Sequence, residues 1–426
     1  MERKPNESWN FAALLIQGVA RRVGNELTSE KLVLPFLYTA LGGSVFFTGL
    51  FAPVVIVARL VAQLLGARLV ELTNRGNILI GLTVAATGAV FVFLGTATGG
   101  LPAALLPVVF IAAATLLGFS NGFSALVFQD LIGRILTDRS RIRLLFTIGA
   151  GSGAIVIVTT LVSQAIVGLE PDAEPARDHF HLLWAGVAMM FVSAVAAFLV
   201  REAPGGAEKA EDGEGYLSSA FRNARLVFRL PWFRRFVRAR VLLLSVEMVL
   251  PFFAVHAATF HADKAPSLSV FVIAVSLGMI GGGLAWPRVG RKSIQLVLSL
   301  SCALAGAAAV LALANHLIGD VQSLLIHAAM IFLLAFGTQG ALDGSTAYVV
   351  RSTTDEERPY CISVSNLIAG IVGIGLALVA GLIAEGPGVI VAIVFMGVIN
   401  AAGAIYTLRL PDVTPAEGAA GGEGAG

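Results

Sequence analysis

Charged residues are scarce in this sequence. Only 13% of its 426 residues are Asp, Glu, Lys or Arg, whereas 57% are hydrophobic and the mean hydropathy is +0.84. Soluble domains hold about 25% charged residues. The composition therefore excludes an ordinary soluble domain and predicts a polytopic membrane protein.

Cysteines and catalytic motifs are equally scarce. The only cysteines, Cys302 and Cys361, lie in or beside apolar segments, so neither a disulfide framework nor a cysteine metal site is predicted. The sequence has no Walker motif, no metal-ligand cluster and no Ser/His/Asp set at usable spacing. We therefore expect no cofactor, no metal and no enzymatic activity. The N-terminal MERKPNES lacks a signal-peptide pattern and is expected to be retained in the cytoplasm.

Long apolar runs dominate the rest of the chain. A run of about 20 apolar residues crosses a bilayer as a helix, and on this basis we count about twelve spans. The predicted spans are Trp9–Ala40, Val45–Gly66, Ile78–Leu94, Pro102–Leu131, Leu145–Val167, Leu182–Val200, Val241–Phe260, Leu268–Trp286, Ile294–Ala314, Leu324–Val350, Ile362–Ile383 and Val389–Leu408. The predicted fold is all-α, with six-helix halves at residues 1–200 and 239–409. A cytoplasmic linker at 201–238 joins the halves, and a disordered tail occupies 410–426.

The basic residues alternate from loop to loop. The loops on one side of the membrane contain only two basic residues, Arg177 and Lys264. The loops on the other side contain all the other basic loop residues. Because Lys and Arg favour the cytoplasmic side, both termini are predicted in the cytoplasm, and the chain is placed in a bacterial-type inner membrane. The segment Leu217–Arg240 mixes Phe, Leu and Trp with arginines, which is typical of a helix at an anionic lipid surface. It is interpreted as a positive-inside anchor or, alternatively, as a regulatory lipid or partner site.

The two halves repeat weakly. Phe119–Asp138 aligns with Phe336–Asp355 at an offset of 217 residues, which places Arg134 over Arg351. Two six-helix repeats joined by a hydrophilic loop are typical of secondary transporters.

Ionisable side chains within the spans fall mainly on the first, fourth, seventh and tenth. Helices that face lipid must be apolar, whereas helices that border a wet cavity need not be. We therefore predict that these four helices surround a central cavity. The candidate cavity residues are Arg22, Glu26, Glu30, Asn121, Glu247, Gln339 and Asp343.

The first span is the most charged. Arg22, Glu26 and Glu30 are spaced i, i+4, i+8 and would share one face of a continuous helix. Either Glu26 or Glu30 is predicted to bind a proton or contact substrate near the midplane. Two alternatives stay open: Arg22 and Glu26 form a static ion pair, or the stretch before Leu32 lies flat at the membrane interface.

The segment GLAWPRVGRK (Gly283–Lys292) follows the eighth span. It resembles the cytoplasmic signature G-x-x-x-D-R-x-G-R-[KR] of the major facilitator superfamily, with Pro287 in place of the aspartate. The degenerate first-half counterpart, Gly66–Asn77, retains the first glycine and one arginine. The resemblance implies alternating access about a midplane site and an inner gate latched by these loops. The candidate gate residues are Arg59, Glu71, Arg75, Gly283, Arg288, Gly290, Arg291 and Lys292.

The expected function is secondary transport of a small organic solute, coupled to protons. The expected partners are that solute, protons and membrane lipid, with no nucleic acid, and the expected state is a monomer. The alternative is a transporter-like membrane scaffold or assembly factor that moves no solute. The sequence leaves the substrate, the coupling ion and the choice between uptake and efflux open.

Overall fold

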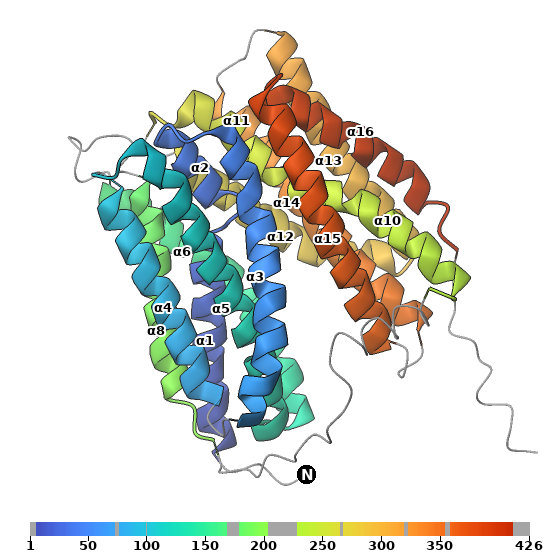
Figure 1. Cartoon of the computed structure of the whole chain (residues 1–426). Helices are drawn as coiled ribbons and strands as arrows, with labels where there is room; N and C mark the ends of the chain where they lie inside the picture. Colours follow the sequence, from blue (N-terminus) through green and yellow to red (C-terminus); the bar gives the residue numbers. More distant parts are fainter. Residues whose placement is uncertain are drawn as a thin grey trace, which may run out of the picture.

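The computed structural model describes residues 6–72, 76–98, 100–167, 179–202, 228–264, 267–318, 323–353 and 358–411. Within these residues the chain is helical, as the sequence predicts (Figure 1). Eleven of the described helices or helix pairs are long and apolar enough to cross a membrane. Many large apolar side chains point outward from them, including Val108, Leu82 and Val310, which suits contact with lipid. The chain is a multi-pass membrane protein.

The helices fall into two groups along the chain. The first contains α1 (Glu7–Leu27), α2 (Val33–Ala40), α3 (Val45–Leu72), α4 (Gly76–Ala97), η1 (Ala103–Leu105), α5 (Leu106–Ile135), α6 (Asp138–Val167) and α8 (Phe180–Phe198). The second contains α10 (Pro231–Met248), α11 (Leu250–His261), α12 (Ser267–Gly290), α13 (Ile294–Leu317), α14 (Leu324–Ser352), α15 (Arg358–Glu385) and α16 (Val389–Thr407). The predicted boundary at 239 lies inside α10. Most of the predicted linker (203–227) and of the tail (412–426) lies outside the described residues.

The two groups pack alike. In the first, α3 packs on α5 and α4 packs on α8; in the second, α12 packs on α14 and α13 packs on α16. Small residues permit these close crossings. A Cβ added at Gly118 or Gly122 of α5 would collide with the α3 backbone at Val55 or Arg59. In the second group the matching glycines, Gly278 and Gly282, lie on α12 and face α14. The repeat therefore preserves the helix pair, but in the second half both partners carry contact glycines, because Gly340 of α14 faces Trp286 of α12.

The first predicted span is not one continuous helix. It divides into α1 and α2, and the seventh span divides likewise into α10 and α11. Pro35 and Pro251 follow the two breaks. Proline lacks the N–H that would bond the carbonyl four residues earlier, which here belongs to Lys31 and Glu247. At the second break this explains the end of α10 at Met248, next to Glu247. At the first break α1 already ends at Leu27, and Pro35 lies in the first turn of α2.

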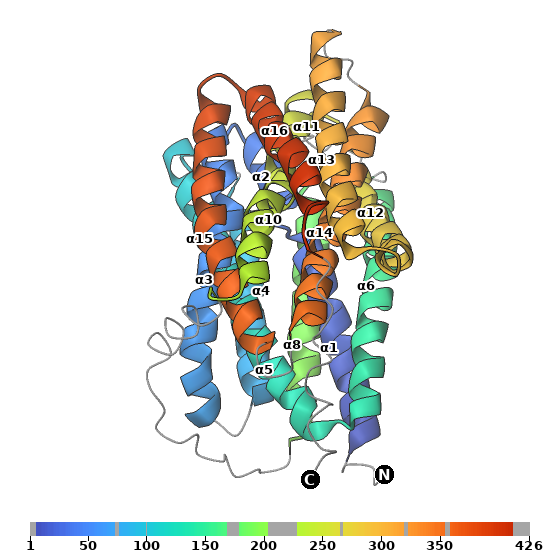
Figure 2. The same cartoon turned by 90° about the vertical axis from the view of Figure 1, so that its right-hand side faces the viewer.

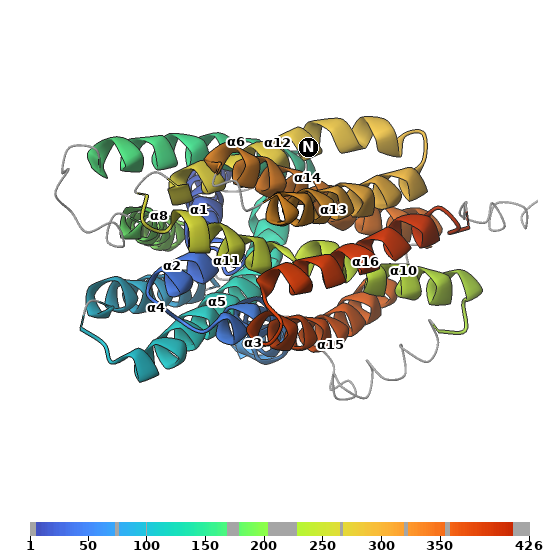
Figure 3. The same ribbon diagram turned by 90° about the horizontal axis from the view of Figure 1, so that it is seen from above.

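The two halves meet most closely at one end. We call the end where α1 begins the terminal end and the opposite end, where α2 ends, the distal end (Figure 2). Across the halves, α2 packs on α11, α3 on α15 and α6 on α12. Viewed from above, α2 and α11 lie near the middle, with the other two pairs on either side (Figure 3). The glycine contacts between α3 and α15 join residues 46–60 to residues 370–381, toward the distal end.

Candidate functional site

A cavity of about 620 Å³ lies between the two halves. Its walls come from α1, α6, α12 and α14. The lining residues are Arg22, Glu26, Gly149, Ser152, Gly153, Ala154, Val156, Ser276, Met279, Ile280, Gly283, Leu284 and Gln339. Apolar side chains and small residues thus surround one basic, one acidic and one amide side chain. This mixture is typical of sites that bind small organic molecules.

Arg22 and Glu26 are the charged groups of this wall. They lie one turn apart on α1 and both face the cavity. Among the described residues they form no ion pair within 4 Å, so the static pair considered from the sequence is absent. Gly149 of α6 lies beside the guanidinium, since a Cβ there would be in van der Waals contact with Arg22 Nη1, at 3.8 Å. The flat interfacial helix is also excluded, since α1 packs on α6 and α8 within the bundle.

Glu30 and Lys31 lie in the break between α1 and α2. The shared face predicted for Arg22, Glu26 and Glu30 required a continuous helix, and the helix ends at Leu27. The shared face therefore holds for Arg22 and Glu26 only. Glu26, in contrast, lines both the central cavity and a smaller hollow toward Val272 and Ser276.

Asn121 lies behind the cavity wall rather than on it. Its Oδ1 accepts a hydrogen bond from Asn25 Nδ2 at 2.8 Å, and its backbone carbonyl lies 3.4 Å from Arg21 Nη2. A side pocket of about 260 Å³ opens here between α1, α5 and α6. Arg22 lines this pocket as well as the central cavity and so connects the two.

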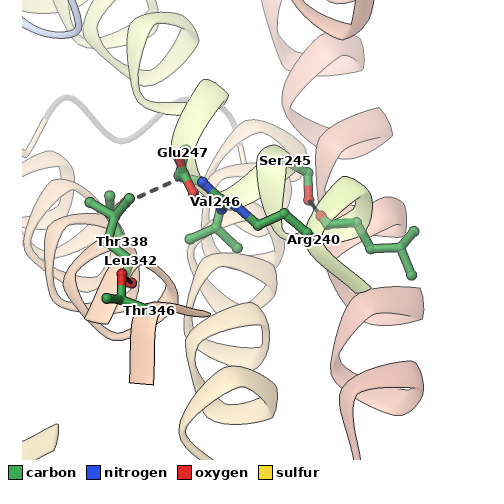
Figure 4. Close-up of polar contacts among 8 residues, drawn as sticks. Arg240, Ser245, Val246, Glu247, Thr338, Leu342 and Thr346 are labelled. Atoms are coloured by element: carbon green, nitrogen blue, oxygen red, sulfur yellow. Dashed lines mark hydrogen bonds and ion pairs between the residues drawn. The ribbon is translucent and has the colours of Figure 1, made fainter. Parts of the chain in front are cut away.

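Glu247 is paired and buried. Its carboxylate forms an ion pair with Arg240, two turns earlier on α10, and the two residues are 7% and 8% exposed (Figure 4). Arg240 was assigned from the sequence to an interfacial segment, and its pairing was missed. The spacing of seven residues on one helix was the available signal, because it places both side chains on the same face. In the described structure Glu247 does not line the central cavity.

Gln339 and Asp343 lie on one face of α14. Gln339 lines the cavity, and its Nε2 donates a hydrogen bond to Asp343 Oδ2 at 2.8 Å. Asp343 is exposed and lies one turn closer to the terminal end. The two side chains therefore form a polar strip that leads from the cavity toward that end.

The predicted gate residues are spread over two helices. Gly283 lines the cavity, and α12 ends at Gly290, followed by the exposed Arg291 and Lys292. Arg288 is exposed and donates to the Leu284 carbonyl of its own helix. In the first half, the Arg59 side chain is exposed on α3. Arg75 and the side chain of Glu71 lie outside the described part of the structure.

Sequence reasoning missed the contribution of α6 and α12 to the cavity. Both spans lack charged residues at this depth, and polarity alone assigned the wall to the first, fourth, seventh and tenth spans. Their polar contribution comes from Ser152 and Ser276. The available signal was the GAGSG run at Gly149–Gly153, whose missing side chains leave the space that the cavity occupies.

A repeat at the helix breaks was also missed. The tetrapeptide VLPF occurs at Val33–Phe36 and again at Val249–Phe252. Each copy begins at or next to a break and supplies its proline. A search for short identical segments in the two halves would have found it.

Comparison with known sequences gives distant relatives. The uncharacterized protein Rv2209 of Mycobacterium tuberculosis (strain H37Rv) is 25% identical over 405 residues, which cover 94% of this chain and 77% of that protein. The uncharacterized protein Mb2232 of Mycobacterium bovis matches to the same extent. No protein-family model matches the chain.

Comparison with solved structures identifies the fold. The nucleoside transporter NupG superposes with a TM-score of 0.68 at 11% identity, covering 94% of this chain and 98% of that one. The xylose transporter XylE of E. coli, in an inward-open conformation, superposes with a TM-score of 0.67 at 10% identity, covering 96% and 98%. This chain has the major facilitator fold.

A third major facilitator structure is also similar. It is a bacterial homolog of the human lysosomal transporter Spinster in an inward-facing conformation, with a TM-score of 0.66, 14% identity and coverage of 96% and 97%. The fold-level resemblance inferred from Gly283–Lys292 is thereby confirmed, as is the prediction of twelve spans in two halves. These similar structures are of membrane transporters, not of enzymes.

Proposed function

We propose that this protein is a secondary transporter that moves a small organic solute by alternating access. The observation that carries the proposal is the cavity of about 620 Å³ between the halves, with Arg22 and Glu26 facing it and unpaired with each other. A charge at membrane depth is costly unless it faces water, a partner or a ligand. Two such groups at the boundary between two similar bundles suit a solute site that each half can expose in turn.

The coupling ion is proposed to be the proton, and Glu26 is the proposed proton-binding carboxylate. Glu26 lines the cavity and lies one turn from Arg22, so its charge can respond to an occupant of the same space. Glu30 is the weaker candidate because it lies in the helix break. A second proposal concerns Asp343 and Gln339, which would guide the solute between the cavity and the terminal end.

The terminal end is proposed to face the cytoplasm of an inner membrane, with both termini there, and the protein is proposed to work as a monomer. The basic loops support this orientation. The contacts between the halves lie toward the distal end, so this structure is proposed to be inward-open, like the similar structure of XylE. The change to the outward-open state would then bring the terminal ends of the two halves together. Arg59, Arg288, Arg291 and the other predicted gate residues would form the inner gate.

Reconstitution into proteoliposomes tests the function. An inward proton gradient is applied, candidate sugars, nucleosides, peptides and amino acids are added, and lumenal pH is followed. We expect at least one solute to move protons, and Glu26→Gln to abolish the proton flux while Glu30→Gln retains it. If no solute changes the proton flux, and a protein partner co-purifies in stoichiometric amount, the result would instead favour the alternative function of a membrane scaffold. Equal flux in wild type and Glu26→Gln would remove Glu26 from coupling.

A further inference from the structure

Histidines gather at the distal end of the molecule. The chain contains 6 histidines, and four of them lie together there and are buried. The four are His179, His256, His261 and His327. They come from different elements: His179 immediately precedes α8, two lie on α11, and His327 lies on α14. The ring centroids of His261 and His327 are 4.8 Å apart, and those of His256 and His327 are 5.3 Å apart.

His261 and His327 form a hydrogen-bonded pair whose direction the neighbours determine. His261 Nε2 lies 3.2 Å from His327 Nδ1, and the same Nδ1 lies 3.0 Å from the Ser323 carbonyl oxygen. A carbonyl oxygen only accepts, so we assign the proton to His327 Nδ1 and the acceptor role to His261 Nε2. A proton added to His261 Nε2 would place two N–H groups face to face. The pair as it stands therefore fits the uncharged form of His261.

The surroundings offer little compensation for an added charge. With Nε2 as the acceptor, the single proton of uncharged His261 lies on Nδ1, and Lys264 Nζ, which can only donate, lies 3.5 Å from that atom. This contact is therefore one of two donors and does not stabilise added charge, whereas Asp263 in the same turn after α11 carries the opposite charge. The other titratable neighbours are His256 on α11 and His327 on α14. The neighbours from α12 are uncharged: Ser267 Oγ donates to the His261 carbonyl oxygen at 2.7 Å, and the ring centroid of Phe271 lies 5.9 Å from that of His261. His261 is 0% exposed, so water does not reach it in this state. A second positive charge beside Lys264, in an apolar site, is repelled.

The pair is coupled to the contact between the halves. Ala262 directly follows His261, and its carbonyl accepts a hydrogen bond from Nε2 of His179 in the first half at 2.9 Å. Phe36 of α2 packs edge-on against the His179 ring at 5.0 Å and against Phe271 at 6.0 Å. A displacement of His261 therefore shifts the Ala262 carbonyl, which accepts the hydrogen bond from His179. It also disturbs the Phe271 ring, which packs against both His261 and Phe36.

We propose that the His261–His327 pair is a proton-binding site that controls the distal gate. The closed gate holds the pair without an added proton, and binding of a proton favours separation of α2 from α11. The inference rests on the proposed alternating access. It adds a second titratable site, remote from Glu26, through which protons on the distal side would promote opening toward that side.

Distance measurements between spin labels test the gate without a known substrate. Labels are placed at Gly100→Cys and Ile318→Cys, two exposed positions at the distal ends of different halves, with Cys302 and Cys361 replaced by serine. The full chain in lipid nanodiscs is compared between about pH 8 and about pH 5, the range in which histidine changes charge. We expect the long-distance population to grow on acidification, by up to about tenfold per pH unit for one preferentially bound proton.

Variants separate the pair from other histidines. His261→Gln and His327→Asn keep a polar group at each site and are expected to abolish most of the pH response. The matched control is His316→Gln, at an exposed histidine at the end of α13, and it is expected to respond as wild type does. If His261→Gln does not fold, His327→Asn alone decides.

The outcomes distinguish the two proposals. A long-distance population that is present at both pH values in equal amount would overturn the proton site and leave alternating access standing. A pH response that persists unchanged in both variants would also overturn it. Absence of a long-distance population in wild type at either pH would count against alternating access itself.

Discussion

The Arg240–Glu247 ion pair gives the sharpest stability prediction. Both side chains are buried in the second half and contact each other directly (Figure 4). Removing one partner leaves the other charge buried and uncompensated. Removing both leaves two apolar side chains in an apolar setting. The two perturbations should therefore have very different effects, although the double change removes more of the native chemistry.

Magnitudes follow from the burial of the pair. Breaking a buried ion pair by removing one partner costs about 3–5 kcal/mol, whereas replacing the pair with apolar residues of similar volume is often neutral or stabilising. At the low end of the usual scaling, about 2 °C per kcal/mol, Arg240→Met or Glu247→Leu alone should lower the Tm by about 6–10 °C. The double variant should recover most of that loss.

The assay is thermal unfolding of purified protein in detergent, followed by intrinsic fluorescence, for wild type, both single variants and the double variant. These four proteins form a double-mutant cycle. Its interaction energy isolates the contribution of the Arg240–Glu247 contact from those of the separate side chains. Additive losses, with the double variant less stable than either single variant, would refute the reasoning. So would an unchanged Tm in Glu247→Leu, since the carboxylate would then contribute nothing to the packed state.

Three further predictions concern helix packing and helix ends. Gly122→Leu should lower the Tm by several degrees because its side chain would collide with the α3 backbone at Arg59. Gly375→Ala, which has open space around it, should be neutral or slightly stabilising. Equal effects of the two substitutions would contradict the packing argument. Glu385→Ala removes the carboxylate that accepts a hydrogen bond from the Phe46 N–H at 3.0 Å across the halves. The free energy that favours the closed distal end should fall by about 0.5–2 kcal/mol, and the long-distance spin-label population should grow. An unchanged distance distribution would contradict this. Ser293→Ala removes the N-cap of α13 and should cost a similar amount in thermal unfolding, with restoration by Ser293→Thr as the check.

Most of the fold could be predicted because a membrane constrains sequence strongly. Each span must be apolar for about 20 residues and must satisfy its own backbone, so apolar runs locate helices almost directly. Ile294–Ala314 was predicted for the ninth span, and α13 is Ile294–Leu317. The breaks were harder. A split helix has the same composition as a continuous one, and only the prolines after Lys31 and Glu247 distinguish them.

The site was less predictable, because small residues without bulky side chains form part of the cavity wall. Glu26 and Gln339 were expected in the cavity and do line it, since ionisable and amide groups at depth need a polar surrounding. Ser152 and the glycines beside it contribute by leaving space, which a search for charge does not detect. Glu247 shows the opposite error: depth indicated a polar setting, but the setting is Arg240 of the same helix rather than water.

The two helix breaks make the halves similar in architecture and different in chemistry. Both breaks are followed by a proline in the first turn of the next helix, Pro35 in α2 and Pro251 in α11. At the first break the nearby helix presents Arg22 and Glu26 to open space, whereas at the second break Glu247 is already paired with Arg240. Because the first set lines the central cavity and the second set does not, the first half is expected to bind the solute charge. The second half then supplies Gln339, Ser276 and the apolar wall. Substitutions of Arg22 should therefore change which charged solutes are accepted, while Arg240 substitutions change stability first, and the opposite pattern would show that the similarity of the halves extends to their chemistry.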